Sequence, residues 1–165
     1  GISGWRSKVP SILTRTSTAP RRSRPVRRRA GGSVGRRLIL DTNVLIDYER
    51  GTLDRTLFDD DDLAIAAVTV AEFRVGIELA DTPTRAAARA SSLALITEFI
   101  EVLGYTETTA IHHARLLAQV RRSGRPRSPH DLIIAAHAAQ TGRVLVSRDS
   151  KARFGDLVGL TTSEP

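Results

Sequence analysis

Short apolar runs alternate with helical patterns along most of this sequence, and this alternation restricts the fold more than any other feature. The runs have the length of buried strands and cover residues 38–40, 63–68, 99–103 and 144–146, with 157–160 as a candidate fifth. Helical patterns lie between them, over 42–50, a short stretch before 59, 69–80, 84–98, 106–122 and 131–141. Strands joined through helices require crossover connections. We therefore predict an α/β fold with a roughly five-stranded parallel sheet and helices on both of its faces.

Four acidic residues stand where such a sheet carries its functional groups. Asp41 directly follows the first apolar run, and Asp149 follows the fourth after two intervening residues. Glu72 and Asp131 lie near the starts of two helices. Strand ends and helix starts point to the same edge of a parallel sheet, where ligands bind. We therefore expect the four carboxylates, which come from four separate segments, to share one crevice.

Each acid also has a purely structural interpretation. The segments 69–72 and 128–131 have the form of capping boxes, in which Thr69 or Ser128 would cap a helix and the acid would bond back to it. Asp149 could start a turn. Asp41 is harder to explain in this way, because a carboxylate directly after a buried strand is costly unless a positive group meets it.

The four acids together favour a metal site. Four carboxylates in one place repel, raise one another's pKa and destabilise the fold, and a divalent cation removes that penalty. Sites with oxygen ligands alone suit hard ions, so Mg²⁺ is the expected cofactor and Mn²⁺ a possible substitute. The sequence has no cysteine, which excludes thiolate ligands and disulfides.

Four segments, in this order, resemble the motifs of PIN-domain ribonucleases, and in particular of VapC-type toxins of prokaryotic toxin–antitoxin systems. The segments are LDTNVLID at 40–47, VTVAEFRVG at 68–76, DLIIAAHA at 131–138, and VLVSRD at 144–149 followed by Phe154. The resemblance covers residues 37–160. It implies a PIN-like fold and a metal-dependent endoribonuclease in which Asp41, Glu72, Asp131 and Asp149 form the acidic metal cluster. It also implies an antitoxin partner, a homodimer or a toxin–antitoxin hetero-oligomer, and a cytoplasmic location.

The chemistry of phosphodiester hydrolysis suggests a role for each acid. Asp41 is predicted to be the central ligand of Mg²⁺, with Asp131 and Asp149 completing the site directly or through water. Glu72 would orient or deprotonate the attacking water. One ion and two ions are both compatible with four acids. The neighbouring side chains expected to hold the carboxylates in place are those of Thr42, Asn43 and Ser147.

Basic and imidazole groups near the acids have more than one interpretation. Arg125, Arg127 and Arg148 could hold RNA phosphates beside the metal, or could be solvated surface arginines. Arg127 also stands where the family more often has an apolar residue. His130 could approach the site, because it precedes Asp131, whereas His137 is expected to pack in the interior.

The net charge of +7 divides unequally along the chain. Residues 1–37 contain eleven Arg or Lys and no acid, whereas residues 38–165 contain 14 basic and 18 acidic residues, a net −4. We therefore predict a basic, disordered tail over 1–36 and a PIN-like nuclease domain over 37–165. The tail is compatible with an arm that binds nucleic acid, an organelle transit peptide, or non-native sequence. An alternative function follows, that of a nucleic-acid-binding PIN module with little or no catalytic activity.

Overall fold

The structure, a computed structural model, describes residues 35–165. The predicted tail therefore lies outside the described residues, except for Gly35 and Arg36. Five strands form a single parallel sheet within the described part: β1 (Arg37–Leu40), β2 (Asp62–Ala66), β3 (Glu101–Leu103), β4 (Val144–Val146) and β5 (Thr162–Ser163). The prediction of a five-stranded parallel sheet is confirmed.

The order of the strands across the sheet is β3-β2-β1-β4-β5. The central strand β1 pairs with β2 on one side, where Ile39 faces Ala64, and with β4 on the other, where Ile39 faces Leu145. The chain thus adds β2 and β3 on one side of β1 and then adds β4 and β5 on the other side. The junction between β1 and β4 is the switch point of the sheet, and ligands of open α/β sheets bind at such points.

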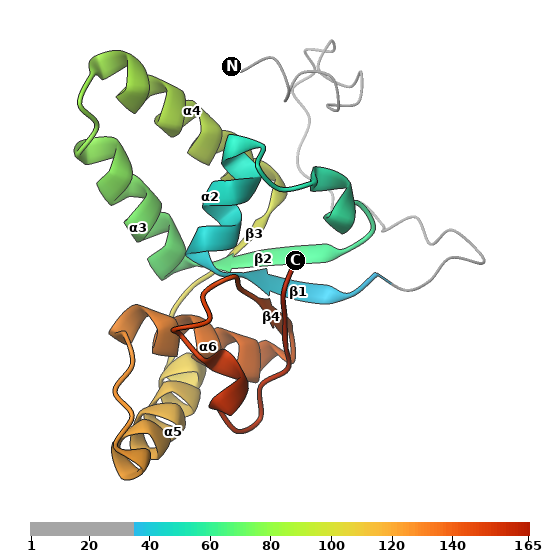
Figure 1. The fold of residues 1–165 in the computed structure, drawn as a ribbon, viewed down its shortest axis with the longest axis vertical. Helices are drawn as coiled ribbons and strands as arrows, with labels where there is room; N and C mark the ends of the chain where they lie inside the picture. The colour runs from blue at the N-terminus through green and yellow to red at the C-terminus, as the bar shows by residue number, and fades with distance from the viewer. Residues whose placement is uncertain (1–34) are drawn as a thin grey trace. The chain divides into compact units, whose positions relative to one another are not determined.

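Helices cover both faces of this sheet, as predicted (Figure 1). On one side lie α2 (Thr42–Arg50), α3 (Ala67–Glu78) and α4 (Pro83–Phe99), and on the other side lie α5 (Glu107–Ser123) and α6 (Pro129–Thr141). Two short 3-10 turns, η1 (Arg55–Phe58) and η2 (Phe154–Asp156), complete the described elements. Within these residues no helix is long and apolar enough to cross a membrane.

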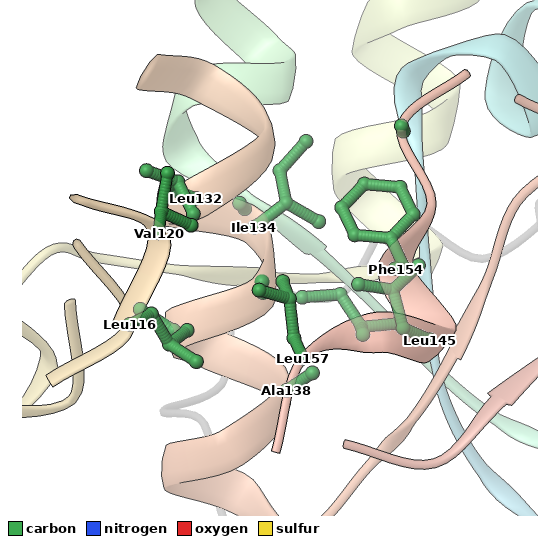
Figure 2. Packing of buried hydrophobic residues seen from close by; sticks show 13 residues of the cluster. Leu116, Val120, Leu132, Ile134, Ala138, Leu145, Phe154 and Leu157 are labelled. Carbon is green, nitrogen blue, oxygen red and sulfur yellow. The ribbon is translucent and has the colours of Figure 1, made fainter. Parts of the chain in front are cut away.

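Helix α6 is fixed against the sheet by an apolar cluster. Leu132, Ile134 and Ala138 of α6 pack with residues of α5 and β4, and with Phe154 and Leu157 near η2 (Figure 2). Each of the five side chains named here is at most 4% exposed. Because Asp131 immediately precedes this anchored stretch, the packing of α6 also fixes the position of its carboxylate.

One predicted strand is wrong. The apolar residues of 157–160 do not form the fifth strand, which lies further on, at Thr162–Ser163. Leu157 is apolar because it packs in the core cluster, and Leu160 packs against the same cluster. Between them Gly159 adopts a left-handed conformation with φ of 84°, which turns the chain into β5.

Charges at the amino edge of the sheet are paired with opposite charges. The Arg36 guanidinium contacts Asp61 at 2.7 Å, which lowers the pKa of that carboxyl group. Arg143, just before β4, is buried and reaches Asp62 at 3.2 Å and Glu101 at 2.8 Å. Acids at this edge are therefore balanced by arginines.

Candidate active site

The four predicted acids lie at the opposite, carboxyl edge of the sheet, around the switch point. Asp41 leaves β1 and is the N-cap of α2, and its backbone N–H donates to the carbonyl of Val146 in β4 at 3.0 Å. Asp41, Glu72 and Asp149 are all close enough to Asp131 to raise its pKa. The four carboxylates that the sequence predicted to gather at this edge therefore lie within electrostatic range of one another.

Asp41 is held by three donors. Its Oδ2 accepts from the Ser147 hydroxyl at 2.7 Å and from the Asn43 amide at 2.9 Å, and its Oδ1 accepts from the Thr42 backbone N–H at 2.7 Å. The residue is only 5% exposed. Burial raises its pKa, the bond from Ser147 opposes that rise, and the carboxylates of Glu72 and Asp149 add to it. Asn43 and Ser147 thus contact the acid that they were predicted to hold.

Glu72 is placed by contacts that differ from the capping-box interpretation. Helix α3 begins at Ala67, directly after β2, so Thr69 is inside the helix and fully buried. The predicted cap by Thr69 is wrong, because strand and helix are joined without a loop, and Glu72 lies in the second turn. Its Oε2 accepts from the Thr42 hydroxyl and its Oε1 contacts His130 Nδ1 at 2.6 Å.

Asp131 lies in the first turn of α6 and belongs to no capping box. Ser128 is the N-cap residue, but its side chain makes no capping bond, so that predicted interaction is wrong as well. The Asp131 carboxylate accepts no hydrogen bond from residues 35–165. Partial burial and the carboxylates of Asp41, Asp149 and Glu72 raise its pKa to about 6, and His130 opposes the shift.

Asp149 has a structural contact of its own. Its Oδ1 accepts from the backbone N–H groups of Lys151 at 2.8 Å and Ala152 at 3.3 Å, so it does organise the turn after β4. Its backbone N–H donates to Ser147 Oγ at 3.0 Å. Ser147 therefore links the acid that follows β1 to the acid that follows β4.

The chemical type of these side chains fits a hard divalent cation. Their positions in this structure, however, do not surround a single ion position. The acids offer carboxylate oxygens alone, one of them without a hydrogen bond, and their mutual repulsion is what a cation relieves. No three His, Asp or Glu side chains in residues 35–165 converge closely enough to hold one ion. In this structure the carboxylates of Asp41, Glu72 and Asp149 are engaged in hydrogen bonds within the protein.

The three predicted arginines have different environments. Arg127 has a side chain only 6% exposed, donates to the Ala152 carbonyl and contacts Asp156 at 3.5 Å, so its guanidinium holds the loop before α6 against the turn after β4. Arg125 is exposed and contacts Asp156 at 3.6 Å. Arg148 contacts Asp47 at 2.9 Å and is partly exposed. An RNA contact remains a prediction for Arg125 and Arg148.

The structure adds two residues to the site. His130 contacts Glu72, an outcome that the sequence left open, whereas His137 is buried as expected. Asp47, to which the sequence assigned no role, holds the Arg148 guanidinium. Asn43 of the same helix accepts from the Arg148 backbone N–H at 3.2 Å. The spacing of four residues, which places Asn43 and Asp47 on one helix face, was the available signal.

Together, these features define an α/β domain with an acidic site at the switch point of a parallel sheet. Comparison with known proteins agrees with this description. The family model for the PIN domain matches residues 38–157. The chain belongs to the PIN-domain family.

Individual relatives lie within the VapC group of that family. The tRNA(fMet)-specific endonuclease VapC of Shigella flexneri is 30% identical over 135 residues, which are 78% of this chain and 97% of that protein. Ribonuclease VapC5 of Mycobacterium tuberculosis is 37% identical over 127 residues, covering 76% and 91%. A crystal structure of VapBC-5 from Mycobacterium tuberculosis, a member of the VapBC family of toxin–antitoxin systems, matches with a TM-score of 0.63 and 32% identity, covering 78% of this chain and 96% of that chain.

The raised pKa of Asp131 predicts how this residue affects stability. Its pKa is 3.8 in the unfolded chain and about 6 in the folded protein, so the unfolded state binds fewer protons between these values. The free energy of unfolding contributed by Asp131 therefore falls as pH rises through this window. In EDTA, Asp131→Asn should have a higher Tm than the wild type near pH 7.5, and the difference should shrink toward pH 4. Thermal unfolding followed by circular dichroism measures both.

The control is Glu98→Gln, which removes one carboxylate from the exposed surface of α4. It should leave the Tm unchanged across the same range. A lower Tm for Asp131→Asn at pH 7.5 would show that the Asp131 carboxylate is not repelled by its neighbours.

Proposed function

We propose that this protein is a metal-dependent endoribonuclease and the toxin of a toxin–antitoxin pair. The main support is the gathering of four carboxylates at the switch point of a PIN fold, with one carboxyl group, that of Asp131, at a pKa of about 6. Further support comes from relatives that are named as an endonuclease and a ribonuclease. The matches to this chain cover nearly the whole length of both relatives. The substrate class we infer is RNA, and the bond cleaved is a phosphodiester.

The cofactor in this proposal is Mg²⁺, with Mn²⁺ as a substitute. Asp41, Asp131 and Asp149 would hold it. When bound, such an ion neutralises the charge of the phosphate and lowers the pKa of a coordinated water. Asn43 and Ser147 orient the Asp41 carboxylate for this purpose, since both donate to its Oδ2.

Glu72 is the proposed base. It is held from two sides, by the Thr42 hydroxyl and by His130, which leaves little freedom in its orientation. A carboxylate positioned in this way can orient the attacking water and accept its proton. His130, in contact with Oε1, positions Glu72 and provides a route by which that proton can leave to solvent, because the imidazole is half exposed.

The same site gives a partner a place to bind. A pocket of about 130 Å³ lies among α2, α3 and α4, lined by Ile46, Phe73 and Arg89 among others, and Glu72 lies at its edge. Leu79, the C-cap residue of α3, is 78% exposed. We propose that the antitoxin covers this apolar surface and directs a basic side chain to the carboxylates. Inhibition would then result from occupation of the acid cluster.

The first test of this function is the substitution Asp41→Asn. The variant keeps the size of the side chain and removes the charge of the predicted central ligand, so RNA cleavage should fall at least about a hundredfold while the Tm stays within a few degrees of the wild type. Purified protein is incubated with total RNA, with Mg²⁺, Mn²⁺ or EDTA, and the cut ends are mapped by sequencing. EDTA should abolish cutting by the wild type.

Asp81→Asn is the matched control, because Asp81 is exposed and forms a surface ion pair with Arg85. It should cut RNA as the wild type does. Mg²⁺-dependent cleavage by Asp41→Asn at the wild-type rate would exclude the proposed site. Absence of any metal-dependent cut by the wild type would favour the alternative of a nucleic-acid-binding module.

The second test concerns the contact between Arg148 and RNA. Arg148→Gln removes a cation that Asp47 holds beside Asp149, so RNA affinity should fall and the slope of log Kd against log salt should decrease by about one. Fluorescence anisotropy with labelled RNA in EDTA measures both quantities. The control, Arg85→Gln, should change neither. An unchanged slope for Arg148→Gln would contradict the RNA contact and leave the ion pair with Asp47 as the role of this guanidinium.

A further inference from the structure

A second hollow lies directly beside the acid cluster, on the side of β4 and β5. It has a volume of about 280 Å³ and is lined by the turn after β4, by η2 and by β5. Asp149 and Ser147 form the wall that it shares with the acid cluster. A molecule bound in this pocket would therefore lie next to Asp149, one of the four acids.

The size of the pocket suits one small group. Ligand pockets in proteins usually measure roughly 300–1,000 Å³, and the volume of about 280 Å³ lies just below that range. Phe154, which lines it, is only 4% exposed because its ring packs into the core cluster (Figure 2). The apolar part of the pocket is thus a small surface of the Phe154 side chain, which the core cluster holds in place.

The polar groups around that surface suit the edge of a nucleobase. Within residues 35–165, no side-chain hydrogen bond is made by the hydroxyls of Ser150, Thr162 and Ser163, and the Glu164 carboxylate has no ion-pair partner. All four residues line the pocket. RNA bases that are recognised individually are unpaired and bind through hydrogen bonds to their edges. An apolar side chain of a protein partner would leave these groups unsatisfied, so the observations favour RNA.

The backbone of Arg153, which also lines the pocket, has an unusual conformation. This residue has φ of 48°, the only left-handed conformation of a non-glycine among the described residues. Such conformations carry strain and concentrate at functional sites. Arg153 also places a partly exposed guanidinium at the pocket, 3.0 Å from Asp156.

We propose that this pocket binds the base of the nucleotide next to the phosphodiester bond cleaved at the acid cluster, with Glu164 as a specificity-determining residue. The position of this base relative to the cut rests on the proposed function. A carboxylate only accepts hydrogen bonds. Guanine offers it two adjacent donors, the N1–H and the 2-amino group, so guanine is the preferred base.

Binding of nucleotides tests the pocket without cleavage. The probes are the four nucleoside 5′-monophosphates and inorganic phosphate, added to the full chain in EDTA, with amide chemical shifts as the readout. GMP should shift the amides of Ser150, Gly155, Thr162 and Ser163, and should bind roughly tenfold more tightly than UMP. Glu164→Gln should remove that preference.

Gly155→Leu blocks the pocket. A Cβ at Gly155 would meet Thr162 Oγ1 at 3.7 Å, an ordinary contact, so the fold should tolerate the larger side chain. Gly104→Leu is the matched control, because a Cβ there contacts nothing within 4 Å. GMP binding should be lost in Gly155→Leu and retained in Gly104→Leu.

Two results would overturn the proposal: equal shifts by all four nucleotides and by inorganic phosphate, or GMP binding that survives Gly155→Leu. Cut-site maps then separate this inference from the proposed function. Cleavage with the same base preference in wild type and Glu164→Gln would refute the inference and leave the nuclease intact. Pocket-specific GMP binding without any RNA cleavage would support the pocket and refute the nuclease.

Discussion

Repulsion among carboxylates at one edge of the sheet is the constraint on which the rest of the structure depends. At the amino edge, Asp61 and Glu101 contact arginines, so the charge of the acids is balanced within the fold. At the carboxyl edge, Asp41 and Asp131 have raised pKa values and contact no arginine among the described residues. Asp41 and Asp131 thus remain without an arginine partner in the described part of the chain, and this is the condition for binding a cation and, through it, a phosphate.

The surrounding structure holds these carboxylates in position. Ser147 contacts Asp41 and the backbone of Asp149, and Thr42 contacts Glu72, so hydrogen bonds connect β1, β4 and α3. Asp131 is positioned by the packing of α6 instead. The function we propose follows from this arrangement, because four segments that are distant in sequence bring carboxylates within electrostatic range of one another.

Much of this arrangement could be predicted from the sequence. The period of the apolar residues indicates strands and helices, and the parallel topology then brings Asp41 and Asp149 to one edge. Contacts that depend on exact boundaries could not be predicted. The start of α3 lies two residues before Thr69, which removes the predicted cap, and burial of Arg127 depends on the distant Ala152 carbonyl. Likewise, the apolar residues near 157 pack in the core, so their pattern indicated a strand where there is a turn.

The central claim is that the crowded acids bind a divalent cation, and the most direct measurement is isothermal titration of the full chain with Mn²⁺ and Mg²⁺ near pH 7.5. We expect saturable binding that weakens as the pH falls through about 6, where Asp131 takes up a proton. We also expect it to be lost in a variant that lacks the Asp41 charge. Binding of equal strength in that variant, or no binding by the wild type, would contradict the claim.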